Sequence, residues 1–327
     1  MTVPVSLTCR ICGNAGPNKA YLAKEMLLGT RDEFEYFECS NCGCLQIKEI
    51  PPDTAKYYPA EYQPFNSIGP KGNFIRRFLK KKMAASIIDR KGIIGRLAPL
   101  VSTLPPILPE LSKCQALFDS RILDVGCGNG RLLMRLKEWG FSNLTGVDLY
   151  VQDKIASDCG VKIIKGEISA LTGKYDVIML HHSFEHMPEP LKTLNEIHRL
   201  LNPDGCALIR MPTVSSYAWR HYGINWLGLG APRHFFLHSL KSMELLASQS
   251  GFRIKEIVFN STRNQFWGSE QYLKGIPFND PTSYACNRRK SIFTRKQLRS
   301  FGKQASQLNA QRQGDQISVY LTPLKEK

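Results

Sequence analysis

The sequence is short of acidic residues and has no long apolar run. Its 327 residues include 28 Asp and Glu against 44 Lys and Arg, which gives a formal net charge of +16. No uninterrupted apolar stretch reaches the roughly 18 residues that a transmembrane helix needs, so a membrane span is not expected. The N-terminus also lacks a signal-peptide pattern, and the two absences together favour a cytoplasmic protein.

Most of the excess positive charge is concentrated in two tracts. Residues 71–96 contain nine Lys and Arg and one acid, and residues 283–303 contain seven Lys and Arg and no acid, which leaves +1 for the rest. Residues 74–91 have apolar side chains at helical spacing and basic side chains on the opposite face, which predicts a basic amphipathic helix. Such a helix can pack on the catalytic domain or contact the anionic inner face of a membrane peripherally; nucleic acid is the less favoured partner.

The ten cysteines are spaced in a way that favours a metal over disulfides. Cys9 and Cys12 form one C-x-x-C-G knuckle, and Cys39 and Cys42 form a second. Four thiolates from two knuckles are the usual ligand set of structural zinc, and the glycine after each knuckle permits a tight turn. Residues 1–50 are therefore expected to form a small zinc ribbon, with four reduced cysteines and no metal as the alternative.

A glycine-rich turn at 124–130 is the strongest functional feature of the sequence. The apolar run 121–125 is typical of a buried strand, and three glycines follow it before a segment with helical spacing. Glycines there let a ligand approach the backbone at a helix N-terminus. A second apolar run ends in Asp148, at the distance where a nucleoside-binding fold places a carboxylate on the ribose hydroxyls. The alternative is an ordinary strand–turn–helix unit without a ligand.

This glycine stretch, Asp-Val-Gly-Cys-Gly-Asn-Gly, resembles the first motif of the class I S-adenosylmethionine (SAM) methyltransferases. The later order of a helix, a turn at 202–205 and an apolar strand also resembles that family. The resemblance implies an α/β fold with a Rossmann-like, mostly parallel seven-stranded sheet whose last strand is antiparallel. It places the methyltransferase domain at 116–327, after the ribbon and a linker at 51–115. The expected strands are 121–125, 144–148, 161–165, 175–180, 206–211, 252–259 and 316–321.

The same resemblance implies which residues contact SAM. Asp148 is expected on the ribose and Glu167 on the adenine side, with a solvated surface glutamate as the alternative interpretation of Glu167. The expected SAM contacts are Asp124, Gly126, Cys127, Gly128, Gly130, Asp148, Leu149, Glu167, Ile168 and His181.

The segment after the fourth expected strand has three histidines within six residues, His181, His182 and His186. Residues beyond the C-terminal ends of parallel strands face the ligand, and histidine is the usual general base near neutral pH. We expect His186 to be the base and Glu185 to orient it, and His182 and His234 are the other catalytic candidates. The alternative is that Glu185 and His186 only hydrogen-bond to fix the loop.

Two aromatic segments flank the expected site. The loop at 211–231 carries tyrosines and tryptophans suited to an acceptor lid that stacks on sugar rings. Tyr57, Tyr58 and Tyr62 either close over the pocket or, as we favour, pack a domain junction. Arg233 can hold a phosphate, and its alternative role is to tie the loop to the next helix.

The pattern Pro232-Arg233-His234, together with the ribbon, resembles a subgroup of class I enzymes from bacterial surface-polysaccharide and nucleotide-sugar pathways. The expected function is SAM-dependent methyl transfer to a hydroxyl of a sugar, nucleotide-sugar or lipid-linked glycan precursor, with carbon methylation as an option. The expected cofactors are SAM and structural zinc. An RNA methyltransferase and a non-catalytic SAM-binding scaffold are the alternatives.

Overall fold

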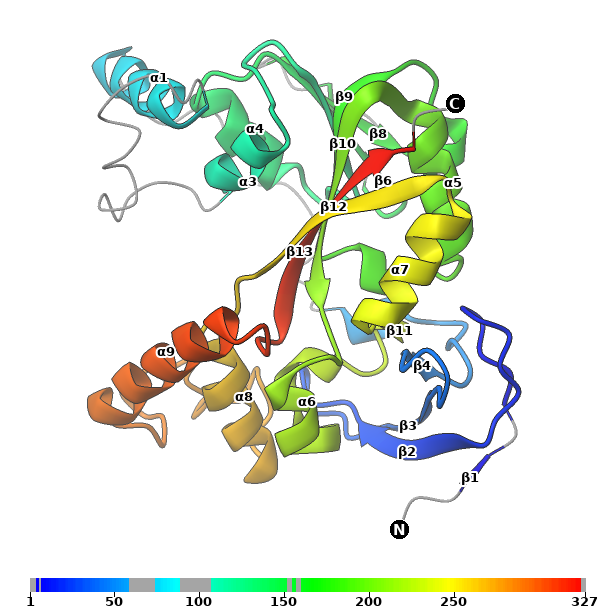
Figure 1. Ribbon diagram of the computed structural model, residues 1–327. Coiled ribbons are helices and arrows are strands. Elements are labelled where there is room, and N and C mark those ends of the chain that lie inside the picture. The colour runs from blue at the N-terminus through cyan, green and yellow to red at the C-terminus, as the bar shows by residue number, and fades with distance from the viewer. Residues whose placement is uncertain are drawn as a thin grey trace.

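The computed structural model has one large sheet covered by helices on both faces and one small sheet near the N-terminus (Figure 1). No helix in the described part of the chain is long and apolar enough to cross a membrane. Tyr62 lies outside the described residues. The structure describes residues 4–5, 7–58, 74–88, 107–151, 155–156 and 160–324.

The large sheet has the predicted strands. They are β5 (Arg121–Val125), β6 (Asn143–Asp148), β7 (Ile155–Ala156), β8 (Val161–Lys165), β9 (Tyr175–His181), β10 (Leu201–Pro212), β12 (Phe252–Phe259) and β13 (Gln316–Pro323). Their spatial order is β12-β13-β10-β9-β5-β6-β8-β7. The strands from β10 to β8 are parallel, and β13 lies antiparallel between β10 and β12. The predicted seven-stranded sheet is therefore confirmed, and the two-residue β7, antiparallel to β8, is an addition.

One predicted boundary is wrong. Helix α5 (Pro190–Leu200) runs directly into β10, so residues 202–205 lie inside the strand and not in a separate turn before it. The register explains the difference, because Leu201 pairs with Tyr175 whereas Cys206 already pairs with Val177. The four residues between them form a bulge in β10, which ends the helix as effectively as a free turn would.

Side chains that alternate along the strands form one hydrophobic cluster on each face of the large sheet. Ile122 and Met179 belong to one cluster, and Leu123 and Ile178 belong to the other. Both faces are buried, which is why these strands are continuous apolar runs in the sequence. The covering helices are α1 (Phe74–Ile88), α3 (Ile107–Lys113) and α4 (Arg131–Glu138) on one face, and α5 and α7 (Leu240–Gln249) on the other.

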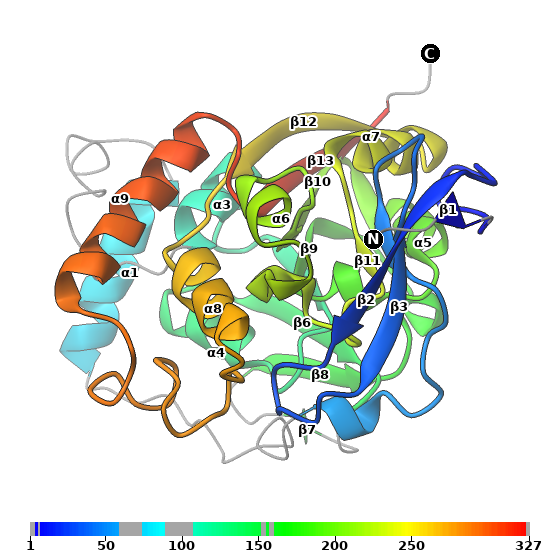
Figure 2. The same cartoon turned by 90° about the horizontal axis from the view of Figure 1, so that it is seen from below.

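The N-terminal residues form an antiparallel sheet that takes its last strand from a segment near residue 236, between α6 (Tyr217–Tyr222) and α7. Phe236 pairs with Gln46 and Leu237 with Leu45, which covers an edge that would otherwise expose unpaired backbone groups. The ribbon and the rest of the chain therefore share one small sheet, as Figure 2 shows from below. The strands are β1 (Pro4–Val5), β2 (Asn18–Lys24), β3 (Glu33–Glu38), β4 (Leu45–Ile47) and β11 (Phe236–Leu237).

The segment expected to be an aromatic lid is folded and largely buried. It contains α6 (Tyr217–Tyr222), and the fully buried Trp226 donates a hydrogen bond from its Nε1 to Asp315 at 2.9 Å. Trp219 packs against Tyr21 of the ribbon, with ring centroids 5.0 Å apart. The predicted stacking on an acceptor is therefore wrong for both tryptophans, because both rings are buried: Trp219 packs on the ribbon, and Trp226 is bonded to Asp315 of the larger domain.

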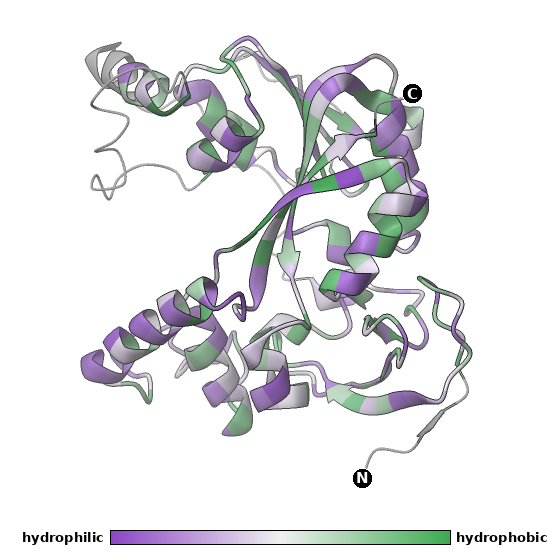
Figure 3. Ribbon diagram, in the orientation of Figure 1, coloured by the Kyte–Doolittle hydropathy of each residue, from purple (hydrophilic) through white to green (hydrophobic). Residues whose placement is uncertain are grey.

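The two basic tracts lie well apart. The first forms α1 over its described residues, and Ala84 and Ile88 are buried in the cluster that includes α3, so this end of the helix packs on the larger domain. The second leads into α9 (Arg295–Ala310), which follows α8 (Asn264–Leu273) and is mostly hydrophilic (Figure 3). α1 and α9 lie at opposite ends of one side of the molecule in Figure 1, and a joint positive face of the two tracts stays a prediction. Contact with an anionic membrane stays a prediction.

Candidate functional site

The glycine turn lies between the end of β5 and the start of α4. Its three glycines have positive φ values, +72° at Gly126, +51° at Gly128 and +67° at Gly130, which other residues rarely adopt. A Cβ on Gly126 would lie 2.5 Å from Ser183, and one on Gly130 would lie 2.2 Å from Ile163, so packing also requires these two glycines. Nothing lies within 4 Å of the same point on Gly128, and the backbone there is open to a ligand.

Asp148, at the end of β6, orders this turn from the neighbouring strand. Its Oδ2 accepts a hydrogen bond from the Gly128 N–H at 2.9 Å, and its Oδ1 accepts one from the Tyr150 N–H at 2.8 Å. Each carboxylate oxygen keeps a further lone pair that can accept from a ribose hydroxyl. The next residues, Leu149 and Tyr150, are 51% and 75% exposed and offer an apolar surface to a base.

Asp124 has a buried carboxyl group with an unused oxygen. It is 2% exposed, and its Oδ1 has no hydrogen-bond partner among the described residues. Burial, together with the charge of Asp148, raises the pKa of Asp124 to about 8. A cationic ligand would compensate this carboxylate, and SAM carries both a sulfonium and an ammonium group. The open cradle at Gly128 and the unpaired Asp124 therefore fit SAM.

The other predicted SAM contacts differ in exposure. Cys127 lies within the turn, where burial raises the pKa of its thiol, so it is unsuited to act as a nucleophile. Glu167 follows β8 and is exposed, and its carboxylate accepts a hydrogen bond from a neighbouring serine hydroxyl at 3.1 Å. Ile168 packs at the edge of the larger hydrophobic cluster. A contact of Glu167 with adenine stays a prediction.

The end of β9 brings a buried carboxylate under the histidines. His182 has a φ of +57°, an uncommon backbone conformation for a residue other than glycine. Its Nδ1 lies 3.5 Å from Oε1 of Glu185, whose side chain is only 1% exposed. Burial alone would raise the pKa of Glu185, but the hydrogen bond from His182 and the neighbouring His186 lower it to about 2. Burial lowers the pKa of His181 to about 3, so this ring is neutral.

His186 and His234 meet edge to face, with ring centroids 4.9 Å apart. The Nδ1 of His186 lies 2.7 Å from the Arg233 carbonyl oxygen, and the Nδ1 of His234 lies 2.9 Å from the Gly228 carbonyl oxygen. Because a carbonyl can only accept, both Nδ1 atoms carry the proton. Burial lowers the pKa of both rings, that of His234 to about 3, and so each presents an unprotonated Nε2. This arrangement can accept a proton.

The sequence matches a known family across this region. A family profile described as a methyltransferase domain matches residues 82–257, about half of the chain, and includes the glycine turn, Asp148 and the histidine segment. The chain belongs to the class I SAM-dependent methyltransferases. The α/β fold expected from the first motif and the expected enzymatic activity agree with this membership.

Individual relatives match part of the sequence of this methyltransferase. It is 29% identical over 212 residues to a ubiquinone biosynthesis O-methyltransferase of Actinobacillus pleuropneumoniae. The matched region covers 57% of this chain and 89% of the relative. It is 28% identical over 179 residues to the protein of the same name from Pseudomonas aeruginosa, with 49% and 76% covered. A solved SAM-dependent methyltransferase from Mesorhizobium loti is 15% identical with a TM-score of 0.43, covering 66% of this chain and 96% of that chain.

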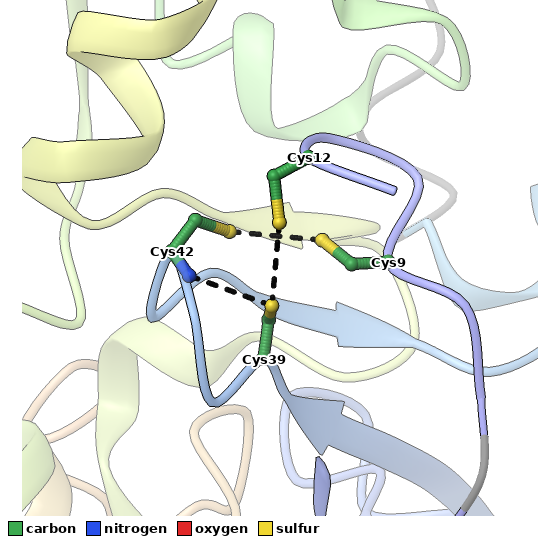
Figure 4. Close-up of side chains that lie close together, drawn as sticks. All are labelled: Cys9, Cys12, Cys39 and Cys42. Atoms are coloured by element: carbon green, nitrogen blue, oxygen red, sulfur yellow. Dashed lines mark hydrogen bonds between the residues drawn. The ribbon is translucent and has the colours of Figure 1, made fainter. Parts of the chain in front are cut away.

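The ribbon of the methyltransferase brings its four predicted metal ligands together (Figure 4). The Sγ atoms of Cys9 and Cys42 lie 3.6 Å apart, those of Cys12 and Cys39 lie 3.5 Å apart, and all four lie within 4.8 Å of one another. Zinc at its usual distance of about 2.3 Å would place tetrahedral sulfurs about 3.8 Å apart. These residues fit structural zinc, and the metal itself stays a prediction.

The knuckle turns have the predicted geometry. Gly13 and Gly43, which follow the cysteine pairs, have φ values of +72° and +70°. Their N–H groups donate to the carbonyls of Cys9 and Cys39 at 2.9 and 2.8 Å. Cys44 is buried 3.9 Å from the Nδ1 of His238, outside the four-cysteine set.

Two tyrosines connect the ribbon side of the methyltransferase to the histidines. The hydroxyl of Tyr36 in β3 donates to the His234 carbonyl at 2.9 Å. The ring of Tyr58 lies 6.2 Å from that of His186, whereas the Tyr57 hydroxyl donates to Asp32 and its ring packs on Phe34, both in the ribbon. Only the proline- and tyrosine-rich composition indicated Tyr58, and no sequence signal indicated Tyr36, because its partner lies about 200 residues away along the chain.

Proposed function

We propose that this methyltransferase transfers the methyl group of SAM to a hydroxyl oxygen of a small acceptor, in the first instance a sugar or glycan precursor. The observation that carries the proposal is the histidine pair beyond the end of β9. Both rings are fixed by backbone carbonyls, and both present an unprotonated Nε2. The relatives named O-methyltransferases support oxygen as the accepting atom.

In the proposed reaction the acceptor oxygen attacks the methyl carbon while the bond from that carbon to the SAM sulfur breaks. The hydroxyl proton passes to an unprotonated histidine nitrogen of this segment, the Nε2 of His186 when no cation is bound, and S-adenosylhomocysteine leaves. Ionised Glu185 stabilises the imidazolium that forms. An alcohol is a poor nucleophile until its proton is leaving, and a positioned base contributes roughly 10²- to 10⁴-fold to the rate. Alignment of donor and acceptor supplies much of the remainder.

A phosphorylated sugar fits the side chains around the two histidines. The guanidinium of Arg233 lies 6.0 Å above the Tyr58 ring, and its buried Nε has no hydrogen-bond partner among the described residues. A cation with an unused donor can bind the phosphate of a nucleotide-sugar or of a lipid-linked glycan. The resemblance of the ribbon and of Pro232-Arg233-His234 to surface-polysaccharide enzymes favours the same class of acceptor.

An aromatic hydroxyl is the second candidate acceptor. The observation in its favour is the similarity to the two relatives, which are ubiquinone biosynthesis O-methyltransferases. A phenol is more acidic than a sugar alcohol and would need less assistance from a base.

Transfer of labelled methyl from SAM separates these acceptors. We expect label in nucleotide-sugars or lipid-linked glycans, and its loss in His186→Ala but not in the exposed His221→Ala. Label confined to phenolic compounds would favour the second candidate. Label only in RNA, with salt-sensitive binding, would refute a small acceptor. SAM binding without turnover on any fraction would indicate a scaffold.

A further inference from the structure

The proposed acceptor site contains a second cluster of metal-ligand type, separate from the four cysteines. One carboxylate oxygen of Glu185 and one ring nitrogen from each of His186 and His234 lie within 4.8 Å of one another. Within the part of the chain that the structure describes, only this cluster and the cysteine cluster bring three or more potential ligands so close.

The backbone selects the ligating nitrogen of each histidine. The Nδ1 atoms donate to the carbonyls of Arg233 and Gly228, which leaves both Nε2 atoms as lone-pair donors. Metal-binding histidines usually show this second hydrogen bond, because it fixes the tautomer and the ring orientation. A backbone bond of 2.8 Å from the N–H of Phe235 to the carbonyl of Glu185 ties the two segments together.

Glu185 supplies the negative charge that a cation needs. It is 1% exposed, and its Oε2 has no hydrogen-bond partner among the described residues. An ionised carboxylate that is buried with an unused oxygen is costly unless a cation or a donor compensates it. His182 approaches only the other oxygen, at 3.5 Å.

We propose that Glu185, His186 and His234 bind a divalent transition-metal cation, which in turn binds the acceptor hydroxyl. Two imidazoles and one carboxylate suit Zn²⁺, Fe²⁺ or Mn²⁺ and leave coordination positions open. The inference rests on the proposed function because it specifies how the acceptor is held.

The cation changes where the hydroxyl proton goes. The cation lowers the pKa of the bound hydroxyl, whose proton passes to His182, the neighbouring histidine that is not a ligand. The oxygen then forms its bond to the methyl carbon as the carbon–sulfur bond breaks. With the cation bound, the Nε2 of His186 is a ligand and not the proton acceptor, so the two roles can be separated by experiment.

Zinc analysis of the full-length protein tests the site. After loading with Zn²⁺ and removal of the excess, we expect two equivalents per chain in the unchanged protein and one in His234→Gln and Glu185→Gln. The four cysteines provide the constant first equivalent. His221→Ala is the matched control, because this exposed histidine of α6 is not in the cluster, and it should retain two. Thermal melting verifies that each variant is folded.

Zinc titration gives the quantitative result. We expect the affinity for the second equivalent to fall by at least about 100-fold in both variants, as for loss of a direct ligand. One equivalent in every protein, with an unchanged affinity, would overturn the site. Unchanged methyl transfer after selective removal of the second equivalent would overturn the role of the cation and leave His186 as base. Two equivalents without methyl transfer to any acceptor would support the site and refute the proposed function.

Discussion

The donor side and the acceptor side of this methyltransferase are built in different ways. The proposed donor side consists of one glycine turn and Asp148, which follow adjacent strands and are joined by a hydrogen bond of 2.9 Å. The acceptor side brings together residues 182–186, residues 233–235 and Tyr58, and Tyr36 of the ribbon holds it. The donor side should therefore tolerate damage to the ribbon, whereas the acceptor side should not.

The largest effect is expected on the donor side. Asp148→Ala removes the groups that order the N–H of Gly128 and of Tyr150 and that would bind the ribose. Hydrogen bonds to a charged group contribute about 1.5–3 kcal/mol each, so SAM affinity should fall by roughly 100-fold or more. Calorimetry measures this, with the exposed Asp53→Ala as control. An unchanged affinity would refute the ribose assignment.

Loss of the cysteine site should affect only the acceptor side. A four-thiolate zinc site contributes about 10–16 kcal/mol to the folding of small domains, so Cys39→Ser should unfold the ribbon and abolish turnover. SAM affinity should stay within a few-fold, because the ribbon does not contribute to the glycine turn. Calorimetry and methyl transfer are compared in Cys39→Ser and in Cys286→Ser, whose thiol is exposed and outside the cluster. If SAM affinity and turnover fall together, the two sides are not independent.

His186→Ala should lower turnover by roughly 10²- to 10⁴-fold and leave SAM affinity unchanged. Burial lowers the pKa of His186 below its ordinary value of 6.5, and the neutral ring is the active form. Turnover of the unchanged enzyme should therefore be constant above pH 6.5 and decline only at lower pH, a decline that the variant lacks. Turnover that survives in the variant would transfer the role of base to His182 or His234.

The smallest effect is expected at the connection between the ribbon and the histidines. Tyr36→Phe removes one buried hydroxyl that donates to the His234 carbonyl, worth about 1 kcal/mol. We expect turnover to fall a few-fold with unchanged SAM affinity. Tyr21→Phe is the matched control, since it removes a ribbon hydrogen bond to Glu38 that does not touch the site. Equal losses in the two variants would show general weakening of the ribbon.

Sequence reasoning was most successful where the chemistry is local. Strands such as β5 and β8 have the predicted bounds, since a parallel strand buried on both faces must be a continuous apolar run. The glycine turn needs its glycines for backbone conformation and close packing, which are properties of a few consecutive residues. The cysteine knuckles are equally local, and their ligands meet as predicted.

The acceptor side could be predicted only in part. The sequence indicated His186 and His234 separately, but nothing in their spacing showed that their rings would meet or that backbone carbonyls would fix both Nδ1 atoms. The interpretation of the 211–231 segment failed for a related reason. An aromatic-rich loop can cover a ligand or be buried in the fold. Tyr21 in β2 places Trp219 at the junction with the ribbon, and Asp315 before β13 holds Trp226 inside the larger domain.

The sequence by itself determined the individual strands, the glycine turn and each cysteine knuckle, because each depends on residues that are neighbours along the chain. The tertiary structure alone decided that β11 completes the ribbon sheet and that Glu185 is buried beneath three histidines. The physical reason is that the tautomers and charges of these side chains are set by burial and by carbonyl partners from distant segments, which exist only once the chain has folded.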